Sequence, residues 1–182
     1  LRRQRQMCIR DRLHIDGAYG GAGILAASVR DLYNGIENAD SFIVDPHKWL
    51  FAPYDCCCLL YRSPKNVYQT FSQHAEYLEG IDHSQTNTSD MAIHLSRRTR
   101  GLPLWYSLVT YGSKKYSEAV EKCISNARKC AEAINQTDHL ELVMEPTLSI
   151  IVFKRKGWEL ADYTNWSNDL ALEGKLLCIP SS

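Results

Sequence analysis

Two side chains, one carboxylate and one amine, occupy matching places in this sequence and could act together on one small molecule. Asp16 ends the strand-like stretch "LHIDGAY" (13–19), and Lys48 follows the next strand-like stretch, "SFIVDPH" (41–47). If one crossover helix joins two parallel strands, both side chains emerge at the same sheet edge, where open α/β folds bind ligands. From these two residues alone, an ordinary ion pair explains the arrangement equally well.

An aldehyde cofactor needs groups of these two kinds. Pyridoxal phosphate (PLP) forms a Schiff base with an amine, and an acidic group opposite its pyridine nitrogen keeps that nitrogen protonated as an electron sink. Ala18 lies two positions beyond Asp16 on the same strand face and is small enough for a flat ring to lie against it. The pattern is therefore consistent with a PLP site that includes Lys48, Asp16 and Ala18.

The elements that must position these residues alternate between strand and helix. A mostly helical segment (20–39) that stops near Gly35 separates the first two strands, and Pro46 closes the second. The third strand, "CCCLLYR" (56–62), is apolar throughout, as expected for a sheet that is covered on both faces. From Pro103 the apolar spacing predicts two helices broken near Gly112, followed by two strands (140–156) that turn at Pro146 and a helix (159–174). The fold class is therefore α/β with a largely parallel sheet, followed by a smaller α+β unit.

Both ends of the sequence differ from the rest. Residues 1–12 are basic and lack apolar periodicity, and we interpret them as a non-native or disordered segment. The last residues, "GKLLCIPSS", stop directly after a strand-like run. We therefore expect a piece of a longer protein, in which 13–136 belong to a large domain and 137–182 begin a truncated small domain.

Composition narrows the class of partner and the compartment. Lys and Arg number 21, as do Asp and Glu, so no bulk charge favours nucleic acid or an acidic membrane surface. No apolar stretch approaches the roughly 20 residues of a membrane span. The seven cysteines form no CxxC pair, which suits neither zinc nor a disulfide framework. We expect a small-molecule partner, no metal, and reduced, mostly buried thiols in a cytoplasmic protein, with Cys56, Cys57 and Cys58 as small core residues.

Longer motifs carry a family resemblance. "HIDGAYGG" followed by "ADSFIVDPHKWLF", then "LSRRTRGLPLW" (95–105) and "EPTLSIIVF" (145–153), resemble the group II PLP-dependent amino-acid decarboxylases over about residues 13–182. This family includes aromatic-amino-acid, glutamate, histidine, cysteine-sulfinate and diaminobutyrate decarboxylases. The resemblance implies a fold-type I PLP enzyme, of which this chain holds the second half of the large domain and the start of the small one.

The resemblance also implies roles for residues around the lysine. Lys48 would form the Schiff base, Asp16 would pair with the pyridine nitrogen, and Ala18 would contact the ring face. His47 would lie beside cofactor and substrate, although a strand-end histidine bonded to backbone is the alternative. Asp45 stands where several relatives have an asparagine that helps hold the phosphate, and a carboxylate there would repel a phosphate.

Other matches favour structural roles. Ser41 could donate to phosphate, but the cap of a strand start is the interpretation that we favour. Arg97 and Arg98 match paired arginines of the family, and we expect one solvated charge and one structural ion pair. For Trp105, Tyr106 and Leu108 we expect packing along a helix.

The reaction implied for the parent protein is decarboxylation of an L-amino acid to the amine and CO2 by a homodimer. The family's proton donor is a tyrosine on a loop that matches 79–90, at about Thr88, yet no tyrosine lies between Tyr77 and Tyr106. The proton donor, and with it the outcome of the reaction, therefore stays open. The family's ring-stacking histidine and phosphate loop precede residue 13, so the isolated chain is expected to be inactive. The alternatives are an aminotransferase, an aldehyde synthase, a desulfurase-like lyase and a non-catalytic scaffold domain.

Overall fold

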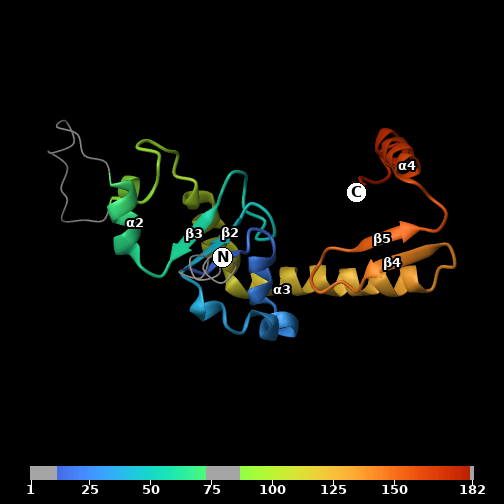
Figure 1. Ribbon diagram of the computed structural model, residues 1–182, viewed down its shortest axis with the longest axis horizontal. Coiled ribbons are helices and arrows are strands. Elements are labelled where there is room, and N and C mark those ends of the chain that lie inside the picture. The colour runs from blue at the N-terminus through green and yellow to red at the C-terminus, as the bar shows by residue number, and fades with distance from the viewer. Residues whose placement is uncertain (1–11, 73–86, 181–182) are drawn as a thin grey trace, which may run out of the picture. The chain divides into compact units, whose positions relative to one another are not determined.

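A computed structural model describes residues 12–72 and 87–180, and the chain forms two compact units, Leu1–Glu121 and Lys122–Ser182 (Figure 1). The division falls within a long helix. The domain boundary predicted near 137 concerns the whole protein and stays a prediction. The segment 1–12, except for Arg12, lies outside the described residues.

A three-stranded sheet organises the first unit. Strand β1 (His14–Asp16) pairs in parallel with β2 (Ser41–Val44), and β2 pairs antiparallel with β3 (Cys58–Tyr61). We expected a largely parallel sheet, but β3 reverses direction because residues 45–57 form a turn and supply no crossover helix, which a parallel return needs. Leu59 and Leu60 are exposed in this chain, so the expected cover on both faces of this strand is absent among the described residues.

Three short 3-10 helices connect β1 to β2, where the sequence predicted a mostly helical segment. They are η1 (Gly20–Leu25), η2 (Ala27–Tyr33) and η3 (Ile36–Asn38). The segment is helical as predicted but forms no continuous α-helix, since glycines at 20, 21 and 23 lower its α-helical propensity. Gly35 follows the C-cap of η2, Asn34, near the predicted stop, and it is the N-cap of η3; its φ of 95° is a left-handed conformation that favours glycine.

The glycine after Asp16 permits a close approach of β1 to β2. A Cβ at Gly17 would lie 2.4 Å from the Phe42 ring and 2.9 Å from the Ile43 carbonyl oxygen, and a Cβ at Gly21 would lie 2.6 Å from the same ring. The Gly17 N–H donates to that carbonyl at 3.0 Å. The two glycines therefore make room for Phe42 and bring the end of β1 against β2.

Helices follow the sheet along the chain. The short helix α2 (Pro64–Phe71), which the sequence analysis did not identify, and the 3-10 helix η5 (Thr88–Met91) precede α3 (Gly101–Asn135). The backbone of α3 is non-helical at Gly112, as the predicted break requires. Beyond it Tyr116 and Val120 are buried, and the Ser117 hydroxyl donates to the carbonyl of Leu25.

The first half of α3 contradicts one expectation. Trp105, Tyr106 and Leu108 are 55%, 59% and 40% exposed, so the described residues bury none of the three as the predicted helix packing requires. The amphipathic pattern shows that this face is apolar, but no described element of the first unit covers it.

The second unit holds the predicted strands and helix. The end of α3 buries Ile124, Ala127, Ala131 and Ile134, which recur at helical spacing. Strands β4 (Leu140–Met144) and β5 (Val152–Arg155) form an antiparallel pair, and α4 (Leu160–Leu172) follows (Figure 1). Among the described residues, no helix has the length and apolarity to cross a membrane.

We predict that Gly17→Ala destabilises the first unit, because the added methyl group meets a backbone carbonyl that cannot move away freely. Overpacking of this kind costs about 1–3 kcal/mol. Gly101→Ala is the matched control, since no atom lies within 4 Å of its added Cβ and its φ is not positive. Chemical unfolding of the two variants in the whole protein should show a loss for Gly17→Ala only; equal midpoints would contradict the close approach.

Candidate active site

The carboxyl ends of β1 and β2 hold the residues that the sequence singled out. Asp16 is the last residue of β1 and lies opposite Ile43, one residue before β2 ends. Beyond the strands, the N–H of Asp45 donates to the Ala18 carbonyl at 2.9 Å. One Asp16 oxygen accepts from the N–H of Ala18 at 3.0 Å. The structure therefore brings Asp16, Ala18 and the turn that carries Lys48 to one edge of the sheet.

A tight turn presents the lysine. The Lys48 N–H donates to the Asp45 carbonyl at 2.9 Å, and the side-chain amine lies 2.9 Å from Oδ2 of Asp45. The Asp45 side chain is 13% exposed and that of Lys48 43%. The hydrogen bond to Asp45 raises the pKa of Lys48, an effect that burial opposes and the charge of Asp16 reinforces. Burial raises the pKa of Asp45, but Lys48 and the Cys57 thiol lower it by more, so the carboxyl is held ionised.

The three consecutive cysteines differ from the prediction. Cys56 is buried, but Cys57 is exposed and Cys58 is intermediate, so only the first is a core residue. The remaining described thiols are not buried either, which corrects the expectation of mostly buried cysteines. Although Cys57 is exposed as a residue, its sulfur is partly covered; this burial, followed by the hydrogen bond to Asp45, raises its pKa to about 11. The thiol therefore stays protonated and acts as a donor.

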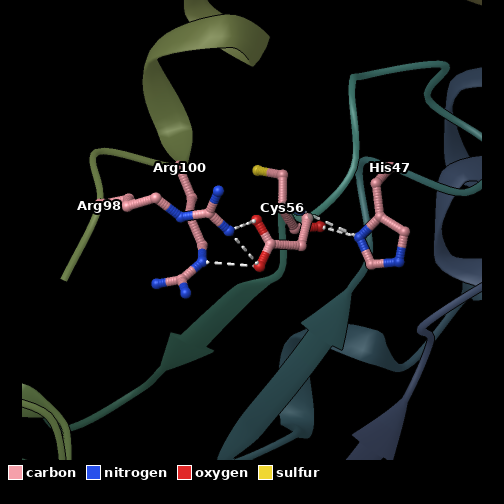
Figure 2. A network of polar contacts seen from close by, with 5 residues as sticks. His47, Cys56, Arg98 and Arg100 are labelled. Carbon is pink, nitrogen blue, oxygen red and sulfur yellow. Dashed lines mark hydrogen bonds and ion pairs between the residues drawn. The ribbon is translucent and has the colours of Figure 1, made fainter.

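His47 is fixed by backbone, as the structural alternative predicted. Its Nδ1 lies within hydrogen-bond distance of both the nitrogen and the oxygen of Cys56, and its ring meets Tyr54 edge-on at 5.0 Å. Figure 2 shows the imidazole facing the Cys56 backbone. This contact orients the ring and leaves Nε2 as the nitrogen that could face a substrate.

An ion-pair cluster lies next to this histidine contact. Arg98 donates to both oxygens of Asp55, at 2.8 and 2.9 Å, and Arg100 donates at 3.1 Å (Figure 2). The hydrogen bond from Arg100 is the main cause that lowers the pKa of Asp55. Arg97 is exposed and donates to the Thr88 carbonyl at 2.9 Å. Arg98 therefore forms the structural ion pair that the sequence predicted for one of the two arginines. The roles of Asp55 and Arg100 were not predicted, because no local sequence pattern indicates that they pair.

The turn is anchored by aromatic residues that sequence reasoning did not connect. Trp49 is 3% exposed and stacks on Tyr19, with ring centroids 5.0 Å apart and planes within 3°. The Trp49 Nε1 is buried without a hydrogen-bond partner among the described residues. The signal that could have indicated this stack is an aromatic residue soon after each site residue: Tyr19 lies three positions after Asp16, and Trp49 directly follows Lys48.

Two further candidates lie away from this edge. The Ser41 hydroxyl bonds Nδ1 of His14 at 2.8 Å, at the opposite ends of β1 and β2 from Asp16 and Lys48. This position fits the favoured strand-start role and not a phosphate contact at the site. Of the predicted loop 79–90, residues 79–86 lie outside the described residues, and Thr88 begins η5.

The residues present fit an aldehyde cofactor with a basic ring nitrogen. Lys48 offers an amine that is partly exposed, Asp16 offers an exposed carboxylate, and Ala18 adds no bulk between them. Among the described residues, no group of three or more His, Cys, Asp or Glu side chains is arranged to hold a metal ion. Covalent attachment at Lys48 and a charge contact at Asp16 are thus the chemistry that this edge can support.

Comparisons with known proteins agree with this chemistry. The family model of the pyridoxal-dependent decarboxylase conserved domain matches residues 6–156, so the chain belongs to the pyridoxal-dependent decarboxylase family. It is 34% identical over 152 residues to an aromatic-L-amino-acid decarboxylase of Bacillus atrophaeus, covering 82% of this chain and 32% of the relative. It is 32% identical over 145 residues to a phenylacetaldehyde synthase of a Rosa hybrid cultivar, and this match covers 78% of this chain and 28% of the relative.

Solved structures share the fold. Oryza sativa TDC, solved with PLP and tryptamine, superposes with a TM-score of 0.84 at 25% identity over 96% of this chain and 38% of that one. The α/β fold class of a PLP-dependent decarboxylase is thus confirmed, as is PLP as the cofactor of the family. The chain spans about a third of the length of the relatives it matches.

Proposed function

We propose that the protein containing this chain decarboxylates an L-amino acid to the amine and CO2, with PLP attached to Lys48. The observation that carries the proposal is the meeting of Asp16 and the Lys48 turn at the carboxyl ends of two adjacent parallel strands. Relatives named for aromatic amino acids favour an aromatic substrate.

Each residue of the site has a separate task in this proposal. Bound PLP supplies a conjugated ring that accepts the electron pair left behind when CO2 departs. Lys48 attaches the cofactor covalently, and Asp16 keeps a proton on the ring nitrogen by its negative charge. Ala18 leaves space for the ring, and His47, oriented by Cys56, presents Nε2 toward the substrate.

An aldehyde synthase is the second candidate. The chain resembles a phenylacetaldehyde synthase from Rosa, and its fold matches a 4-hydroxyphenylacetaldehyde synthase from Rhodiola rosea with a TM-score of 0.77. No tyrosine lies between Tyr77 and Tyr106, so the proton donor that amine formation needs is unassigned. This gap also supports the aldehyde synthase as an alternative. The product distinguishes the two candidates: an amine for the decarboxylase, an aldehyde for the synthase.

The parent protein is further proposed to be a cytoplasmic homodimer. The exposed apolar face on the first half of α3, formed by Leu102, Trp105, Tyr106 and Val109, supports burial against another surface in the whole protein. The family resemblance implies that each site is completed by a neighbouring subunit.

We expect borohydride reduction of the whole protein with bound PLP to place the pyridoxyl group on Lys48. Tryptic peptides analysed by mass spectrometry locate the adduct, and Lys48→Arg should abolish it. Lys115→Arg, which changes an exposed lysine on α3, should leave the adduct in place. An adduct at another lysine would overturn the assignment.

Asp16→Asn should retain covalent PLP but slow turnover by about two orders of magnitude or more, because an uncharged ring nitrogen is a poorer electron sink. Each tenfold loss corresponds to about 1.4 kcal/mol of barrier. Steady-state CO2 release measures the effect, and Asp31→Asn, an exposed carboxylate on η2, is the control. A turnover within about twofold of the wild type would make Asp16 a structural residue only.

Sedimentation of the whole protein should give a dimer at micromolar concentration. Replacing Trp105 and Val109 together by polar residues should shift it toward monomer and reduce CO2 release in parallel, since both side chains are more than half exposed in this chain. A fully active monomer would contradict the proposal that a neighbouring subunit completes each active site.

A further inference from the structure

The ion pair between Asp45 and Lys48 is built into the turn that carries it. Asp45, Pro46, His47 and Lys48 form one turn, closed by the 2.9 Å backbone hydrogen bond from Lys48 to Asp45. Pro46 is fully buried, and a proline at this position fixes the backbone of the turn in advance. The carboxylate and the ammonium therefore face each other because of backbone geometry, not by a chance meeting of long side chains.

The groups around Lys48 favour its charged form. Asp45 is in direct contact at 2.9 Å, and Asp16 adds a second negative charge from the end of β1. From the segment before β3, Cys57 donates to Asp45 as a neutral thiol. His47 is the neighbouring titratable group, and its charged form acts on Asp45. Both carboxylates thus oppose loss of a proton from the Lys48 amine.

We propose that Asp45 gates the amine of Lys48: the carboxylate binds the ammonium form, and only opening of this ion pair makes the amine available to an aldehyde. This inference deepens the proposed function, on which it rests, by naming the residue that controls cofactor attachment. It assigns Asp45 to the lysine and not to the phosphate that a carboxylate would repel.

When the ion pair opens, the ammonium of Lys48 first gives one proton to water, since the lowered pKa of Asp45 makes its carboxylate a poor proton acceptor. The lone pair of the neutral amine then attacks the aldehyde carbon, the nitrogen gives up its two remaining protons, the carbonyl oxygen takes up two protons and leaves as water, and a C=N bond remains.

Competitive labelling tests the gate without any cofactor. The whole protein, free of PLP, is treated with trace acetic anhydride across a pH series, and mass spectrometry quantifies acetylation of Lys48 against exposed lysines. In Asp45→Asn the labelling curve of Lys48 should move to lower pH, with labelling at pH 8 raised about three- to tenfold as more of the amine is unprotonated. Asp45→Glu keeps the charge and should stay close to the wild-type curve.

The chain offers a matched control in a second ion pair with the same spacing. Lys115 and Glu118 also lie 2.9 Å apart at i and i+3, outside the site. Glu118→Gln, the corresponding change in this second pair, should leave the labelling of Lys48 unchanged. Asp45→Ser is the second neutral variant if Asp45→Asn does not fold, as judged by circular dichroism.

An unchanged Lys48 curve in a folded neutral variant would overturn the gate, whatever the enzyme's activity. This result is distinguishable from failure of the proposed function. A borohydride adduct at another lysine would remove the role of Lys48 in PLP chemistry, while the labelling curves would still report whether Asp45 controls the amine.

Discussion

The parallel pairing of β1 with β2 is the constraint on which the site depends. The register places Asp16 opposite Ile43, and the Gly17 N–H continues the pairing to the Ile43 carbonyl. Since side chains alternate along a strand, a slip of one residue would turn Asp16 to the other face of the sheet. The register holds because Phe42 fills the space that Gly17 and Gly21 leave open, so a packing contact fixes the position of the carboxylate that is proposed to contact the cofactor.

The turn after β2 exposes the Lys48 amine although most of the neighbouring residues in the sequence are apolar. Pro46 and Trp49 are buried on either side of Lys48, and Ala52 closes the segment by donating to the Pro46 carbonyl at 3.0 Å. The apolar residues therefore anchor the backbone while the amine remains 43% exposed. The hydrophobic neighbours of Lys48 do not surround its charge; they hold the turn in place.

The sequence predicted those features of the fold and of the candidate site that local residue patterns encode. The end of β1 at Asp16, the end of β2 shortly before Pro46 and the break at Gly112 follow from residues close in sequence, while the meeting of Asp16 with the Lys48 turn follows from the predicted parallel pairing of the two strands. The reversal of β3 was missed because the apolar pattern of a strand does not encode its direction, although the short connection 45–57 without a helix already favoured an antiparallel return. The ion pairs of Asp55 join residues more than 40 positions apart and leave no local signal. The apolar pattern around Trp105 likewise predicts a helix face that is buried in the whole protein, but it does not indicate whether the surface that buries it belongs to the same chain.

The charges at this edge also restrict where a phosphate group can lie. Asp16 and Asp45 are two negative groups, and Lys48 is the cation paired with them, so the edge carries an excess negative charge before any ligand binds. The guanidinium groups of Arg98 and Arg100 form their ion pairs with Asp55 and not with Asp45. A phosphate beside Asp45 would add repulsion that no described cation offsets. The described residues thus offer no free cation for a phosphate beside Asp45, which supports the proposal that this carboxylate acts on the lysine amine.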